Sequence, residues 1–313
     1  MKPKVRVYKI EDYEYDPLRQ VIFDCLERLS PLEDLKGRKV IVKPNLLSPA
    51  TPETAILTHP FIVRAVTEYF LQHKAVVQIS DSPAMGSFQR VLTKGGFKEA
   101  LEGLGGSFVE FKETKEVDIG KPFGKVELSR DVLEADLVVN LPKLKTHTQM
   151  LLTLAVKNLF GTVVGARKPE WHFRTGVDRM HFARLLVRIA KTIGPKINIL
   201  DGVWALEGQG PGKRGTPKHL GLLMASDDPF AIDWAVCRMI GLKPEDLLTL
   251  KVAIEEGIIT EEPEIEGQLP EVRDFQLPEI TSLVFGPSFL RGFLRRHLTQ
   301  RPTVEPPKCT LCG

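Results

Sequence analysis

The chain has 313 residues, of which 42% are hydrophobic and 27% are charged, and its formal net charge is +3. This composition is typical of a folded protein with one large domain or two ordinary ones, and it excludes a disordered acidic chain. The charge excess is too small to indicate a nucleic-acid partner, and no apolar stretch approaches the roughly 18 residues of a membrane span. We expect a cytoplasmic protein with no nucleic-acid or membrane partner, in which any basic site is local.

Five short runs rich in valine, isoleucine and leucine end abruptly in polar or turn residues, as strands buried on both faces of a parallel sheet do. They occupy residues 40–42, 76–79, 137–139, 197–200 and 220–224. Segments with helical periodicity lie at residues 61–73, 180–193 and 229–240. This alternation predicts an α/β fold with a mainly parallel, doubly wound-like sheet and helices on both faces. Val138, Ile199 and Leu222 should then lie on neighbouring parallel strands.

Residues 1–288 are expected to form this α/β domain, with an irregular or edge-strand segment at residues 261–278. Arginines alternate with apolar side chains at residues 289–298, which predicts an amphipathic basic helix, and the prolines of residues 301–308 indicate a linker. Cys25 and Cys237 lie in apolar stretches and are expected in the core. Cys309 and Cys312 have little to pack against in the terminal sequence Cys-Thr-Leu-Cys-Gly, so they need another explanation.

Polar side chains follow the predicted strands where each strand ends, which is where ligands bind in open α/β sheets. Asp81 and Asp228 are interpreted as turn or helix-capping residues. The other candidates are Lys43 and Asn45, then Lys143, Lys145 and His147, then Asp201. If residues 141–147 are extended, two ammonium groups and an imidazole converge on one face, where they could bind a carboxylate or phosphate and transfer a proton. A solvated strand edge with its charges in water is the alternative interpretation.

A lysine and an asparagine interrupt the apolar stretch at residues 151–160, which otherwise contains only Thr153 as a polar residue. A lysine amid so much apolar sequence is either a helix-end cation that reaches water or a buried functional ammonium. We favour the second interpretation. Lys157 and Asn158 are therefore expected to line the same pocket as Lys43, Lys145 and His147.

A glycine-rich loop at residues 207–215 contains Gly208, Gly210, Gly212 and Lys213. It lacks the following helix of a dinucleotide-binding fingerprint and the residue spacing of a Walker loop. We expect it to cover a bound anion with its backbone N–H groups and cations, with a plain surface loop as the alternative. Asp201 and Glu207 could supply oxygen ligands for magnesium, whereas the histidines are too scattered for a zinc motif.

Four segments, in this order along the chain, resemble the domain-of-unknown-function family 362. They are VKPNL at residues 42–46, LKTH at 144–147, AVKNLFG at 155–161, and DG at 201–202 followed by EGQGP at 207–211. The resemblance implies a C-terminal ferredoxin-like iron–sulfur module, and Cys309 and Cys312 look like its first two ligands. A cubane cluster needs four thiolates, so residues 309–313 are expected to be the start of a truncated module that holds no complete cluster.

The resemblance and the predicted cation cluster together lead to the hypothesis of a redox-type enzyme that acts on a small anionic substrate. Electrons would come through the iron–sulfur module from an electron-transfer partner. Substrate binding is assigned to Lys43, Asn45, Lys143, Lys145, Asn158 and the glycine-rich loop, and catalysis to His147, Lys157 and Asp201. The alternatives are a non-redox anion-binding or carrier protein, and a metal-dependent hydrolase or transferase that uses Asp201 and Glu207.

Overall fold

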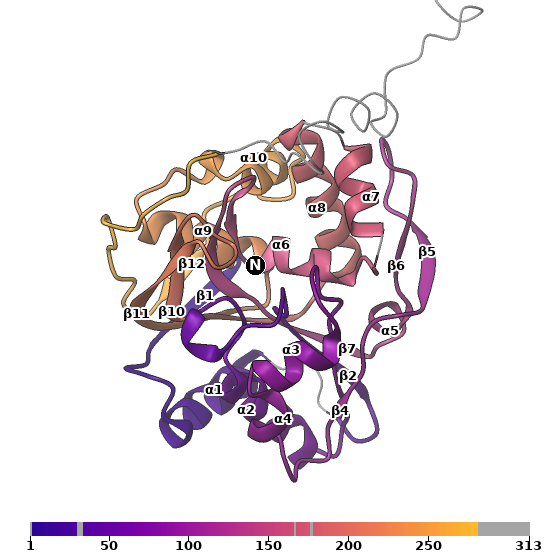
Figure 1. Cartoon of the computed structure of the whole chain (residues 1–313). Coiled ribbons are helices and arrows are strands. Elements are labelled where there is room, and N and C mark those ends of the chain that lie inside the picture. The colour runs from indigo at the N-terminus through magenta and orange to yellow at the C-terminus, as the bar shows by residue number, and fades with distance from the viewer. Residues whose placement is uncertain (1, 30–33, 166, 176–177, 281–313) are drawn as a thin grey trace, which may run out of the picture.

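A mixed, mostly parallel sheet of ten strands forms the centre of the part of the chain that the structure describes (Figure 1). The computed structural model describes residues 2–29, 34–165, 167–175 and 178–280. Eight strands follow the order β12-β1-β11-β10-β7-β2-β3-β4, and β8 and β9 extend from β10. The strands are β1 (Lys4–Lys9), β2 (Lys39–Pro44), β3 (Val76–Ile79), β4 (Ser107–Phe108), β7 (Leu137–Leu141), β8 (Lys143–His147), β9 (Leu151–Thr153), β10 (Ile197–Gly208), β11 (Gly215–Ser226) and β12 (Glu264–Glu266).

The five predicted strands are all present, but they are not all parallel. Strands β2, β3, β4, β7 and β10 run parallel to one another, so Val138 and Ile199 do lie on neighbouring parallel strands. Leu222 lies on β11, which is antiparallel to both β10 and β1, so its predicted direction is wrong. The cause is that β10 continues to Gly208 and turns directly into β11, so the glycine-rich loop is the tip of a hairpin.

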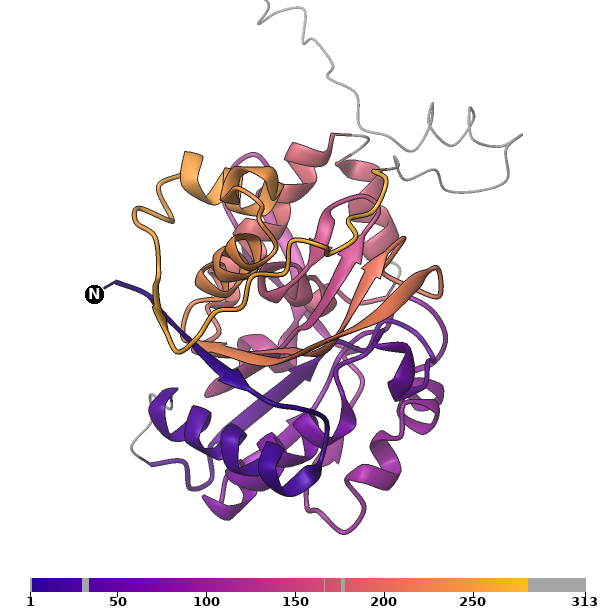
Figure 2. The same cartoon turned by 90° about the vertical axis from the view of Figure 1, so that its left-hand side faces the viewer.

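Helices cover both faces of the sheet (Figure 2). On one face lie α1 (Tyr15–Leu29), α2 (Pro60–Gln72), α3 (Phe88–Lys94) and α4 (Phe97–Ala100). On the other lie α6 (Ala155–Asn158), α7 (Arg167–Arg174), α8 (Arg179–Ile193), α9 (Pro229–Met239) and α10 (Leu248–Glu255). Smaller elements are the hairpin β5 (Thr114–Asp118) and β6 (Lys125–Ser129), the helix α5 (Arg130–Leu133), and the 3-10 turns η1 (Pro52–Thr54), η2 (Leu159–Thr162) and η3 (Pro244–Asp246).

Each face of the sheet has its own apolar core, and each core contains one of the two internal cysteines, as predicted. Cys25 of α1 packs with α2 and the inner residues of β2 and β3. Cys237 of α9 packs with α8 and β11 on the other face. Burial of both sheet faces explains why the strand sequences are continuously apolar rather than alternating.

The three predicted helices correspond to α2, α8 and α9, and their ends follow the expected capping chemistry. Asp228 accepts a hydrogen bond from the Phe230 N–H at the start of α9, as predicted, and Asp178 does the same for two N–H groups of α8. Gly194 ends α8 at a positive φ of 54°, which favours glycine.

Two peripheral segments were also predicted. Residues 261–278 contain only the short edge strand β12 and irregular chain, in agreement with the sequence. The predicted basic helix at 289–298, the linker, Cys309 and Cys312 lie outside the described residues. No helix in the described part of the chain is both long and apolar enough to cross a membrane.

Candidate functional site

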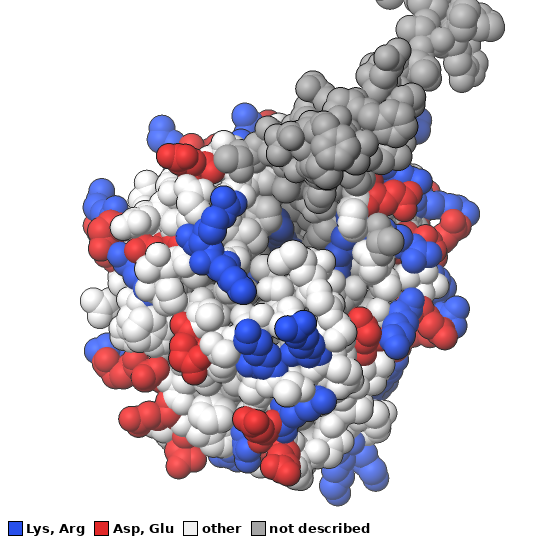
Figure 3. All heavy atoms as spheres, viewed as in Figure 1, with Lys and Arg blue, Asp and Glu red and all other residues white. Residues whose placement is uncertain are grey.

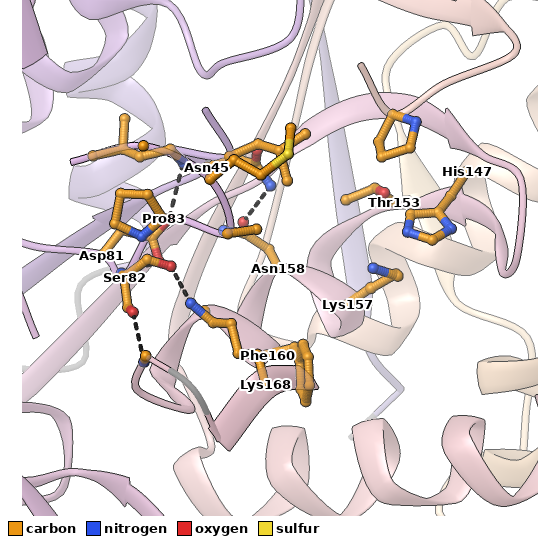
Figure 4. A pocket seen from close by; sticks show the side chains of 18 of the residues that line it. Asn45, Asp81, Ser82, Pro83, His147, Thr153, Lys157, Asn158, Phe160 and Lys168 are labelled. Carbon is orange, nitrogen blue, oxygen red and sulfur yellow. Dashed lines mark hydrogen bonds between the residues drawn. The ribbon is translucent and has the colours of Figure 1, made fainter. Parts of the chain in front are cut away.

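A cavity of about 590 Å³ lies where the chain leaves the carboxyl ends of β2, β3 and β8. Its remaining walls come from β9, from α6 and the turn after it, and from α7. His147, Thr153 and Lys157 lie at one end, and Asp81, Ser82 and Lys168 lie at the other (Figure 4). This is the position at which open α/β sheets bind ligands.

The surrounding surface does not share the basic character of the cavity. Basic and acidic side chains are interspersed over the described residues of the face in Figure 3, as the small net charge leads one to expect. The cavity wall, in contrast, carries Lys145, Lys157 and Lys168 against Asp81 and Glu110. The basic site is therefore local, as predicted.

Lys145 lines the cavity, and its ammonium is held by neutral groups only. Its side chain is 1% exposed, and its ammonium donates to Asn45 Oδ1 and to the Ile56 carbonyl, both at 2.7 Å. Burial lowers the pKa of Lys145 well below its ordinary value, and the nearby charge of Lys157 lowers it further. The predicted extension of β8 is present, and it brings Lys145 and His147 to the cavity wall.

A chain of buried amides fixes the orientation of Asn45. Its Nδ2 donates to Asn158 Oδ1 at 2.9 Å, and Asn158 donates in turn to Asn140 Oδ1 at 2.8 Å. Asn140 donates to Asn198 Oδ1 at 2.9 Å and to the Ala155 carbonyl. Each amide is thereby locked in one direction, so Asn45 presents its oxygen to Lys145. The predicted Asn45 and Asn158 both line the cavity.

The imidazole of His147 lines the cavity and has one ring nitrogen that accepts hydrogen bonds from the backbone. Its Nδ1 accepts from the backbone N–H groups of Gln149 at 3.1 Å and Met150 at 3.3 Å, which places the ring proton on Nε2. Burial lowers the pKa of His147 well below 6.5, and the charge of Lys157 adds to this effect. A neutral imidazole that carries its proton on Nε2 can donate a hydrogen bond to a ligand.

Lys157 lines the cavity from α6 and makes no hydrogen bond or ion pair with any described residue. Burial, together with the charge of Lys168, lowers the pKa of Lys157 to about 8. The predicted ammonium is therefore present in the cavity wall, where the Lys157 side chain is partly rather than fully buried. Beside it, Thr153 is 4% exposed, and its hydroxyl has no partner within the described part of the chain.

Lys168, on α7, was not predicted as a site residue. Its ammonium donates to the Ser82 carbonyl, and burial lowers its pKa to about 8. The sequence around Lys168 shows only interleaved basic and aromatic residues, with no strand end beside it. Its position in the site follows from the packing of α7, which no local pattern reveals.

Asp81 is also part of the wall, and its role is larger than that of a turn residue. Its carboxylate lies 3.0 Å from the Lys43 ammonium and accepts hydrogen bonds from the backbone N–H groups of Leu46 and Ser82. Lys43 is fully buried behind the wall. It was predicted to line the cavity but does not. A Cβ at Gly161 would overlap both Asp81 and Lys43, so the glycine allows their pairing.

Asp201 and Lys143 lie outside the cavity, which corrects their predicted place. They form an ion pair of 2.8 Å, buried on both sides, and Tyr13 donates its hydroxyl to Asp201 at 2.6 Å. Tyr13 stacks on His59 and lines a separate pocket of about 450 Å³. Asp201 was expected at the end of its strand, but β10 runs on for seven more residues, so its carboxylate holds the middle of the strand in place.

The glycine-rich loop reaches the cavity only through Pro211. Gly208, Gly210, Gly212 and Lys213 do not line it, which differs from the predicted anion cover. Gly210 rests against β8: its N–H donates to Thr146 Oγ1 at 3.1 Å, and a Cβ there would overlap the Thr146 backbone. Lys213 is exposed at the hairpin tip.

Asp201 and Glu207 are not brought together for a magnesium ion. They stand six residues apart on β10, which corresponds to roughly 20 Å along an extended strand. Glu207 lies 3.5 Å from the Lys218 ammonium and accepts from the Gln276 N–H, while Asp201 pairs with Lys143. Within the described ranges, no group of three or more His, Cys, Asp or Glu side chains is placed to hold a metal ion.

Comparison with known proteins agrees with the resemblance noted in the sequence. The family described as "Domain of unknown function (DUF362)" matches residues 40–238. A protein named Thylakoid-associated protein sll1697, from Synechocystis sp., is 34% identical over 315 residues, which cover 98% of each chain. The lactate racemase apoprotein from Thermoanaerobacterium thermosaccharolyticum is 14% identical, with a TM-score of 0.42 over 69% of this chain and 53% of that one. The family match and the full-length relative show that this chain belongs to the DUF362 family.

Proposed function

We propose that the chain is an enzyme that binds a small carboxylate- or phosphate-bearing substrate in the cavity between β8 and α7. One observation carries this proposal. Of the lysines around the cavity, Lys145, Lys157 and Lys168 have no carboxylate within 4.0 Å among the described residues, whereas Lys43 has Asp81. Buried ammonium groups without counter-charges are unfavourable, and a bound anion would supply the missing charge.

The hydrogen-bond donors of the cavity wall are placed where a bound anion could contact them. Lys157 and the Nε2–H of His147 lie at one end of the cavity, and Lys168 lies at the other. The Thr153 hydroxyl adds a neutral donor that has no partner within the described residues. Preformed donors around a volume of about 590 Å³ suit a ligand of small-metabolite size.

The redox part of the proposal rests on the family resemblance and on Cys309 and Cys312. Two thiolates are half of the four that a cubane cluster requires, so these residues do not by themselves fit the cofactor, and no step is assigned to it. We propose that a form of the protein with two or more further cysteines after Gly313, purified without oxygen, contains iron and acid-labile sulfide, and that Cys309→Ser in that form lowers both. If that form contains no iron, the redox part fails and a non-redox anion carrier is the better account.

Binding of the anion is tested by calorimetry with pyruvate and with inorganic phosphate as probes. Lys157→Met and Lys168→Met should each weaken binding of the better probe by about 10- to 150-fold, because each removes a hydrogen bond from a charged donor. Lys251→Met on α10 is the matched control, since Lys251 is exposed and outside the cavity. Unchanged affinity in both cavity variants would overturn the proposal.

The cellular compartment of the protein is a separate part of the proposal. We propose that the protein works in the cytoplasm, as the sequence composition led us to expect. The Synechocystis relative is named as thylakoid-associated, so attachment to a membrane surface is the outcome that would contradict this. Fractionation of cells into membranes and supernatant, with and without a high-salt wash, distinguishes the two.

A further inference from the structure

We propose that Lys157 is a nucleophile that condenses with the carbonyl group of an anionic substrate, an aldehyde or 2-oxo acid, to form an imine. This inference rests on the proposed anion site and is independent of the redox part. It specifies the substrate class, because an anion without a carbonyl group could bind in the cavity but could not react there.

Lys157 has the one unengaged amine among the described lysines of the cavity wall. Lys145 uses its ammonium to donate to Asn45 and to the Ile56 carbonyl. Lys168 donates to the Ser82 carbonyl. Lys157 has no hydrogen bond or ion pair with a described residue, so its nitrogen is available to a ligand.

The groups beside Lys157 are suited to stabilise the charge that develops when an amine adds to a carbonyl group. The Thr153 hydroxyl is buried and without a partner in the described residues, and the His147 ring presents an N–H at Nε2 (Figure 4). Both groups belong to strands, β9 and β8, which hold them in place. Addition of an amine to a carbonyl group develops negative charge on the carbonyl oxygen, and two fixed donors stabilise that charge.

The protonation state of Lys157 also favours this reaction, since only a neutral amine is nucleophilic. With a pKa of about 8, Lys157 is about half neutral at pH 8, against under about 1% for an ordinary lysine. Burial and the charge of another cation, here Lys168 across the cavity, are two means by which proteins activate lysine for this reaction. The neutral fraction of Lys157 is thus about 100-fold larger than that of an exposed lysine.

The reaction balances without an oxidant or reductant. The Lys157 nitrogen forms a bond to the carbonyl carbon as the carbonyl π pair moves to oxygen, and one proton passes from nitrogen to oxygen. The carbon–oxygen bond then breaks as the oxygen takes up a second proton and leaves as water, while the nitrogen loses its remaining proton to give the imine. A cation at the other end of the cavity, Lys168, is placed to hold the substrate's carboxylate during these steps.

The test is reductive trapping on the full chain with pyruvate and sodium cyanoborohydride at pH 8, followed by peptide mass mapping. We expect a carboxyethyl adduct on Lys157, formed faster with pyruvate than with uncharged acetone. Lys157→Arg keeps the positive charge and should lose the adduct while still binding pyruvate in calorimetry. Lys251→Arg is the matched control and should be labelled at Lys157 as the wild type is, because its change lies on the exposed face of α10.

A second variant keeps the test valid if Lys157→Arg does not fold. Thr153→Val retains Lys157 and should slow formation of the adduct, with the folded state checked by circular dichroism. Binding of pyruvate without an adduct on Lys157, or with adducts spread evenly over exposed lysines, would overturn the imine while leaving the anion site intact. No binding of pyruvate or phosphate would overturn both.

Discussion

The buried ion pair between Lys43 and Asp81 offers the sharpest test of how the site is held together. Asp81→Asn keeps the size of the side chain but leaves the Lys43 ammonium, which is 0% exposed, without a counter-charge. Removing one partner of a buried pair costs about 3–5 kcal/mol of unfolding free energy. With an unfolding entropy of roughly 2.1 cal/mol/K per residue, a chain of this length should melt about 5–8 °C lower.

The assay is chemical and thermal unfolding followed by circular dichroism, with two comparison variants. The double variant Lys43→Met, Asp81→Asn removes both charges and should recover most of the lost stability. Glu113→Gln breaks an exposed pair with Arg130 and should cost less than about 1 kcal/mol.

The pH dependence of this effect has a definite sign. Burial lowers the pKa of Lys43 in the folded protein, and loss of Asp81, which raises it, should lower it further. Between the folded pKa and the ordinary value of about 10.4, the unfolded chain binds more protons, so stability rises with pH there. The deficit of Asp81→Asn should therefore shrink as pH rises toward 10. An equal loss for Asp81→Asn and Glu113→Gln, or no recovery in the double variant, would refute the reasoning.

Three further predictions concern other parts of the site. Gly161→Ala should lower the melting temperature, since its Cβ would overlap Asp81 and Lys43; an unchanged melting curve would contradict this. Tyr13→Phe should cost about 1–3 kcal/mol in denaturant unfolding by removing a hydrogen bond from buried Asp201, with pyruvate affinity unchanged because Tyr13 lies outside the cavity. Asn45→Asp should weaken pyruvate binding measured by calorimetry, because its carboxylate would neutralise Lys145; tighter binding would count against an anion site.

The sequence predicted those features that depend on local pattern. The apolar runs at 40–42, 76–79 and 137–139 became β2, β3 and β7 because strands buried on both faces must be continuously apolar. Lys145 and His147 reached the cavity because β8 is extended and its residues alternate.

Features that depend on tertiary structure were missed or misplaced. Nothing in the run at 197–200 shows that β10 continues for eight more residues and returns as β11. Asp201 was therefore wrongly predicted to lie at a strand end, and the glycine-rich loop to lie over the ligand. Lys168 enters the site through the packing of α7 against the Ser82 loop, a contact between residues 86 positions apart. The only sequence signal around Lys168 was a mixture of charged and aromatic residues.

The central claim is that the ammonium groups of the cavity, which have no carboxylate partner, bind an anion. Measuring the protons that the protein takes up on binding tests this claim most directly. Propionate resembles pyruvate but has no ketone that could react with Lys157, and it does not titrate near pH 8, so calorimetry with propionate in buffers of different ionisation enthalpy reports the protein's protons alone. A bound anion should raise the pKa of Lys157 and Lys168 above about 8, giving net proton uptake near pH 8 and affinity that falls as pH rises from 7 to 9.5. Affinity that is independent of pH over this range, or proton release on binding, would contradict the account.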